Sequence, residues 1–148
     1  MDRCKYAAEL FVGGCNCSQA VFAAFADVMN MDRDTALRLS SSFGGGMGRM
    51  REVCGAVSGM LLVAGILYGY DTPGDDSIKA EHYQRIQDMA GQFRTEAGSI
   101  ICREILKNPP SDPSPTARSE EFYKMRPCTR MVYLAAEIMS NYISANPV

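Results

Sequence analysis

The chain has 148 residues, of which 47% are hydrophobic, enough for one well-formed core and too few for two full domains. Its formal net charge of −2 comes from interspersed acidic and basic residues, which excludes the basic patch expected for nucleic acid or an anionic membrane. The first residues are charged and lack the apolar core of a signal peptide. We therefore expect a cytoplasmic protein with a single domain over residues 1–148.

The first half of the chain shows apolar residues at helical spacing, interrupted by glycine and aspartate signals. Gly13 and Gly14 end a first helix, and Asp32 is placed to cap a third. The most apolar stretch, about residues 56–70, is too short to span a bilayer, so we interpret it as a buried central helix. The helices predicted here cover about residues 2–12, 17–28, 32–41 and 51–68.

The second half predicts a polar helix over about residues 76–95, a short helix after Ser99, a turn of helix near residues 119–125 and a last helix from Pro127. Residues 108–116 contain four prolines and predict a surface loop. No segment alternates as a strand would. The sequence thus predicts an all-α fold, a compact bundle of about five to seven helices.

The cysteines give the strongest functional signal. Four of the six fall at predicted helix starts, where free N–H groups and the helix dipole stabilise a thiolate. They form no local CxxC pair, so the fold would have to assemble any shared site, as helical bundles do. Small buried structural cysteines are the alternative interpretation. The four candidates, both as catalytic residues and as metal ligands, are Cys17, Cys54, Cys102 and Cys128.

The motifs around these cysteines, taken together, resemble a known family over about residues 5–143. They are Asn16–Val21, Phe43–Gly48, Val53–Gly59, Cys102–Glu104 and Cys128. The combination resembles the redox-active protein family named for its C_GCAxxG_C_C motif, and the resemblance implies the same four cysteines as its functional residues. A related domain occurs in split-Soret cytochromes c, but this chain lacks the CxxCH that attaches haem, so we expect no haem.

Two cysteines and a histidine fall outside this pattern. Cys15 lies two positions before Cys17 and could act as a resolving thiol, while Cys4 has no assigned role. His82 is the only histidine and is surrounded by polar residues, so we interpret it as a surface imidazole instead of a metal ligand.

Glycines flank the second of the four cysteines. The run before it, with Arg49 and Arg51, could cradle an anion or the sulfides of a cluster, or could simply form a tight helix–helix turn. The two glycines after it share one helix face, where close approach of another helix is favoured over room for a cofactor. The candidate cofactor-binding glycines are Gly44, Gly45, Gly46, Gly48, Gly55 and Gly59.

Three functions fit these residues. The first is an iron–sulfur protein, an oxidoreductase or electron carrier for electron transfer or redox sensing, working with a redox partner protein. The second is a metal-free thiol–disulfide protein that relies on a low thiol pKa at the helix starts. The third is a structural Cys4 zinc site in a helical interaction module. The absence of closely spaced cysteine pairs favours redox chemistry over zinc, and the apolar helices leave a homodimer open.

Overall fold

The computed structural model describes residues 1–148, except for the side chains of Glu121, Lys124 and Met125. Within these residues it contains seven helices of six or more residues, two helices of four residues and one isolated β-bridge. The all-α prediction and the predicted number of helices are confirmed. The helices are α1 (Arg3–Val12), α2 (Cys17–Ala23), α3 (Arg33–Ser40), α4 (Gly44–Met47), α5 (Gly55–Tyr68), α6 (Asp76–Ala97), α7 (Cys102–Ile105), α8 (Glu120–Met125) and α9 (Cys128–Ala145), with a 3₁₀ turn η1 (Ser41–Phe43).

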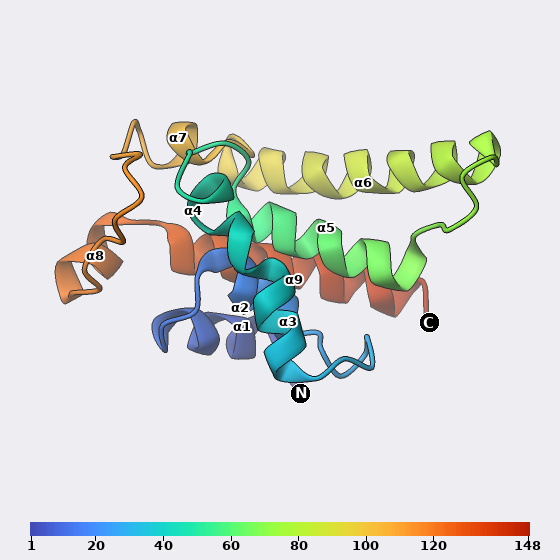
Figure 1. Cartoon of the computed structure of the whole chain (residues 1–148), viewed down its shortest axis with the longest axis horizontal. Helices are drawn as coiled ribbons and strands as arrows, with labels where there is room; N and C mark the ends of the chain where they lie inside the picture. The colour runs from blue at the N-terminus through green and yellow to red at the C-terminus, as the bar shows by residue number, and fades with distance from the viewer.

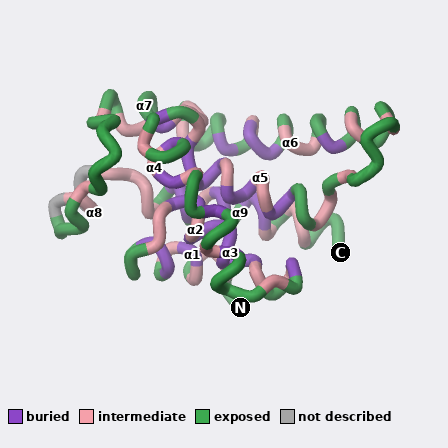
Figure 2. Tube along the Cα trace, in the orientation of Figure 1, coloured by how far each residue is buried: buried purple, intermediate pink, exposed green. Residues whose placement is uncertain are grey.

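The helices lie in layers when viewed as in Figure 1. The long α6 lies along the top, α5 and α9 run beneath it, and α1 to α3 lie below them. The central helix α2 packs against α1, α3, α5 and α9. Figure 2 shows that buried residues concentrate where α2, α5 and α9 meet, whereas α6 buries only one face. The short helices α4, α7 and α8 lie together at one end of the molecule.

Helix α2 begins with a capping box, in which the Asn16 side chain accepts from the Gln19 N–H and the Gln19 side chain accepts from the Asn16 N–H. It is shorter than predicted, because the chain forms turns from Ala24 to Asn30. Arg3 donates to the Ala24 carbonyl and so satisfies one of the groups that the helix end leaves free. The apolar run stays buried without the helix, since Phe25 is fully enclosed.

Helix α5 is the buried central helix that the sequence predicts, but it begins at Gly55 and not near Arg51. Residues 51–54 are not helical because they pair with residues 100–103, through a bridge between Val53 and Ile101. No local sequence signal predicts this pairing, since the two segments lie far apart along the chain. Among the described residues, no helix combines the length and apolar character needed to cross a membrane.

His82, on helix α6, is buried and does not lie on the surface as the sequence predicted. The imidazole is only 8% exposed, contacts the Tyr70 ring edge-on, and places Nδ1 2.8 Å from an Arg85 nitrogen. Arg85 also donates to the Tyr142 hydroxyl of α9, so the pair ties α6 to the helices below it. The prediction of a surface imidazole is wrong because His82 falls on the one face of this polar helix that packs inward.

Candidate functional site

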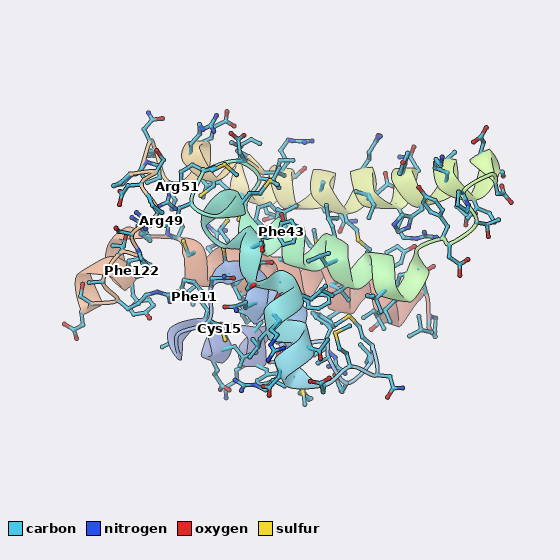
Figure 3. All side chains as sticks on the ribbon, viewed as in Figure 1. Phe11, Cys15, Phe43, Arg49, Arg51 and Phe122 are labelled. Atoms are coloured by element: carbon cyan, nitrogen blue, oxygen red, sulfur yellow. The ribbon has the colours of Figure 1, made fainter. Side chains whose placement is uncertain are left out.

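A cavity of about 300 Å³ lies at the end of the molecule that carries α4, α7 and α8. Figure 3 shows that four residues of its lining, Phe11, Arg49, Arg51 and Phe122, gather at this end. The lining combines cysteines, arginines, glycines and apolar side chains contributed by segments far apart in the sequence. Its cysteines are Cys17, Cys54, Cys102 and Cys128, and its arginines are Arg49, Arg51, Arg118 and Arg126.

All four cysteines that the sequence singles out therefore line one cavity, and each lies at a helix start. Cys17, Cys102 and Cys128 are the first residues of α2, α7 and α9, and Cys54 is the N-cap of α5. Cys4 and Cys15 are absent from the lining. The fold thus separates the six cysteines into a set of four that share a cavity and two that do not.

Backbone pairing holds Cys54 and Cys102 side by side. The Cys54 N–H donates to the Ile100 carbonyl at 2.7 Å, and the Cys102 N–H donates to the Glu52 carbonyl at 2.6 Å. Gly46 makes room for this arrangement, because a Cβ at its position would lie 2.7 Å from the Cβ of Cys102, and its φ of +73° also disfavours other residues.

Cys17 approaches the start of α5 over another glycine. A Cβ at Gly55 would overlap the Cys17 sulfur, and a Cβ at Gly44 would overlap the Asn16 side chain. Asn16 also donates to the Ser41 carbonyl, which ties the start of α2 to η1. These glycines are required because two helix starts and a turn meet within van der Waals contact.

The candidate glycines fall into two groups. Four of them line the cavity, namely Gly44, Gly45, Gly48 and Gly55. The other two do not: Gly46 packs against Cys102, and a Cβ at Gly59 would lie 2.7 Å from the Ser18 carbonyl of α2. The structure therefore places Gly59 at a helix–helix contact, the role that its spacing favoured.

Burial raises the pKa of three of the four cysteines that line the cavity. It raises the pKa of Cys17, raises that of Cys54 well above its usual range and raises that of Cys128 to about 12, with the neighbouring thiols adding to each shift. Backbone N–H groups at the helix starts lower the pKa of Cys17 and Cys54 by less than burial raises it. The expected low thiol pKa is therefore wrong for these three cysteines in the metal-free protein.

The four cysteines line one cavity without forming a site for a single metal ion. Among the described residues, no three His, Cys, Asp or Glu side chains come close enough together to hold a single metal ion. The six cysteines are all free thiols. A single zinc ion would need four sulfurs at roughly 2.3 Å from one centre, which this arrangement does not provide.

The arginines of the lining include two that the sequence pattern did not reveal. Arg118 and Arg126 follow the proline-rich loop, and no motif marks them. Arg118 donates to the carbonyls of Phe11 and Cys15 and stacks on the Phe11 ring. This arginine therefore fastens the segment before α8 to the end of α1.

Arg51 is the most buried of these arginines, with 3% exposure. Its Nε donates to the Pro110 carbonyl at 2.8 Å, its Nη1 lies 3.7 Å from the Cys102 sulfur, and its Nη2 has no hydrogen-bond partner among the described atoms. The backbones of Met47, Arg49 and Arg51 all have positive φ, which non-glycine residues adopt at a cost. The segment before α5 is therefore strained where it presents its arginines to the cavity.

These features define an all-α protein in which four helix starts present cysteines to one cavity. Comparison with protein-family models matches residues 15–142 to the family described as "Putative redox-active protein (C_GCAxxG_C_C)". The chain belongs to this family. It carries Cys54-Gly55-Ala56-Val57-Ser58-Gly59 where the family name writes GCAxxG, with the first two residues in the opposite order. Comparisons with curated proteins and with solved structures find no match.

Proposed function

We propose that the four cysteines hold an iron–sulfur cluster and that the protein serves electron transfer or redox sensing. The observation that carries this proposal is the lining of one cavity of about 300 Å³ by cysteines from four separate helix starts. Four thiolates are the usual ligand set of such clusters, and soft sulfur ligands select them. Membership in a family described as redox-active supports the same chemistry.

A cluster is larger than a single ion and needs a cavity with several thiolates along its wall. The four cysteines line one cavity of about 300 Å³, whereas no three His, Cys, Asp or Glu side chains among the described residues come close enough together to hold one ion. When bound, the cluster would supply a one-electron redox couple. The chain would supply the thiolates, and their ligation would release protons because burial keeps the pKa of Cys17, Cys54 and Cys128 high.

Arg51 is placed to act on the sulfur of Cys102. Its Nη1 lies 3.7 Å from that sulfur, and both side chains are buried. Hydrogen bonds to ligand sulfurs and the charge around a cluster are among the factors that set its reduction potential. The buried guanidinium thus belongs to the chemistry of the site as well as to its packing.

The test is elemental analysis with visible absorption on protein purified without oxygen, comparing wild type, Cys54→Ser and Cys4→Ser. Serine is a good N-cap residue, so Cys54→Ser removes a ligand while keeping the start of α5. Cys4 lies outside the cavity and provides the matched control. We expect iron, sulfide and visible absorption in wild type and Cys4→Ser, and their loss in Cys54→Ser with the helical circular dichroism retained.

Two other results would contradict the cluster. About one zinc per chain without colour would indicate a structural site. Protein without metal, whose thiol count falls by two or four on mild oxidation and recovers on reduction, would indicate thiol–disulfide chemistry. An unchanged metal content in Cys54→Ser would show that the cavity is not where the metal binds.

A further inference from the structure

The cavity carries more positive charge than the described side chains neutralise. Four arginines line it, and among the side chains that the structure describes only Arg49 has a carboxylate partner, Asp112 at 3.7 Å. Arg126 is close enough to Arg51 and Arg49 for their charges to lower the pKa of its guanidinium, after the larger effect of burial. Like charges gathered in a partly buried space favour the entry of an anion.

The arginines differ in how their donors are used. Arg49 donates to the Asp112 carbonyl and to Thr116, so its guanidinium anchors the proline-rich loop. By contrast, the Arg51 Nη2 is buried and has no partner among the described atoms, and the one side-chain hydrogen bond of Arg126 to a described residue is a long one of 3.4 Å, from Nη2 to the Thr116 hydroxyl. A buried charged donor without an acceptor is costly, which indicates that a ligand completes it.

We propose that the cavity binds a small oxyanion, held between the guanidinium groups of Arg51 and Arg126. A planar guanidinium matches the paired oxygens of a carboxylate, sulfate or phosphate group. Arg51 precedes α5 and Arg126 precedes α9, so the two groups reach the cavity from different elements. Phe11 and Phe122 add apolar walls, which limit the site to a small anion and strengthen its charge interactions by excluding water.

The same arginine contacts the sulfur site and the proposed anion site. Arg51 directs Nη1 at Cys102 and leaves Nη2 free, so a bound oxyanion would lie next to a cysteine of the proposed redox centre. The anion would therefore be positioned as a substrate or an effector of that centre. The proposed donors are arginine groups and not thiolates, so anion binding can be measured in the metal-free protein, where no cluster shares the cavity.

The test is isothermal titration calorimetry with sodium sulfate and, separately, sodium acetate, at constant ionic strength maintained with chloride. The full chain is titrated both metal-free and as purified without oxygen. Arg51→Gln and Arg126→Gln remove the two guanidinium groups, and Arg130→Gln is the matched control because Arg130 is exposed on α9 and lies outside the cavity. We expect saturable binding in wild type and Arg130→Gln, weakened at least about tenfold in each of the other two variants.

The two anions distinguish an inorganic oxyanion from an organic carboxylate, and saturable binding of either supports the site. The absence of saturable binding in both forms of the wild-type protein would overturn the proposal. Equal weakening in Arg130→Gln would also overturn it, since the loss of binding would then come from the lower overall positive charge and not from a site in the cavity. Arg126 is only partly buried, so Arg126→Gln keeps the test decisive if Arg51→Gln does not fold. Metal content does not enter the readout, so this test and that of the cluster fail separately.

Discussion

Burial has a larger effect on the pKa of the individual cysteines than their position at a helix start. Cys128 is the first residue of the long helix α9, with Arg126 and Arg118 lowering its pKa, yet desolvation raises that pKa to about 12. The sequence locates Cys128 at a helix start because capping and proline signals are local. It does not reveal the pKa, because the apolar surroundings come from segments distant in the chain.

We expect iodoacetamide alkylation of Cys128 in the metal-free, reduced protein to accelerate about tenfold per pH unit from pH 7 to pH 10, following the thiolate fraction. The urea-unfolded chain provides the reference, where the rate should level off above an ordinary thiol pKa of roughly 8.5. Mass spectrometry of the Cys128 peptide measures both rates. A plateau below pH 9 in the folded protein would contradict the raised pKa.

Single helices were predictable wherever their ends carry local signals. Asp32 caps α3, Ser119 caps α8, and Gly98 ends α6 in the left-handed conformation, as their residue types indicate. The start of α5 was not predictable, because Val53 pairs with Ile101 across the fold. Local chemistry thus determines most helix boundaries, whereas the boundary beside the cavity depends on a long-range pairing.

The contact between α2 and α5 gives a test at the scale of an element. Gly59→Ala would place a Cβ 2.7 Å from the Ser18 carbonyl, and such overpacking should lower the free energy of unfolding by about 1–3 kcal/mol. Gly65→Ala on the same helix meets no atom within 4 Å and should raise it by about 0.5–1 kcal/mol, as alanine favours a helix over glycine. Urea unfolding of both variants measures the difference, and equal effects would rule out close packing at Gly59.

The stability of the whole molecule should depend on pH through its one histidine. Burial, followed by the charge of Arg85, lowers the pKa of His82 in the folded protein. Below about pH 6.5 the unfolded chain therefore binds a proton that the folded protein resists, so the free energy of unfolding should fall as pH falls from 7 to 5. Tyr70 contacts the ring edge-on, and its hydrogen bond with Tyr83 raises its pKa, so it does not titrate in this range.

Urea unfolding of the metal-free protein at pH 7.5, 6.5 and 5.5 measures this dependence, with His82→Gln as the comparison. The variant keeps a polar partner for Arg85 and removes the titrating group, so its stability should change less over the same range. The same pH dependence in both proteins would show that His82 is not its source.

At the scale of the whole molecule, the sequence predicted that the fold would have to bring the four cysteines to one site, and the packing of the helices places all four along one cavity. Spacings of 37, 48 and 26 positions separate Cys17, Cys54, Cys102 and Cys128, so no local pattern brings them together. Their helix starts meet because α2, α5 and α9 share a core and α7 is paired to the segment before α5. Arg49 and Arg51 were marked by the glycine run beside them, whereas Arg118 and Arg126 reach the cavity through this packing and had no signal of their own.

The direction of α9 determines which end of the protein should be linked to an electrode. This helix begins at Cys128 beside the cavity and ends at Ala145, about 27 Å away for 18 residues at 1.5 Å each. Figure 1 shows the C-terminus at the opposite end of the molecule from α8. An electrode linked beyond Ala145 would hold the cavity away from the conductor, so an electron from the proposed cluster would have to cross the length of the helix. Linkage near α8 would shorten that path. Comparing the two linkage points would therefore show how the electrochemical response depends on the distance between the electrode and the cavity.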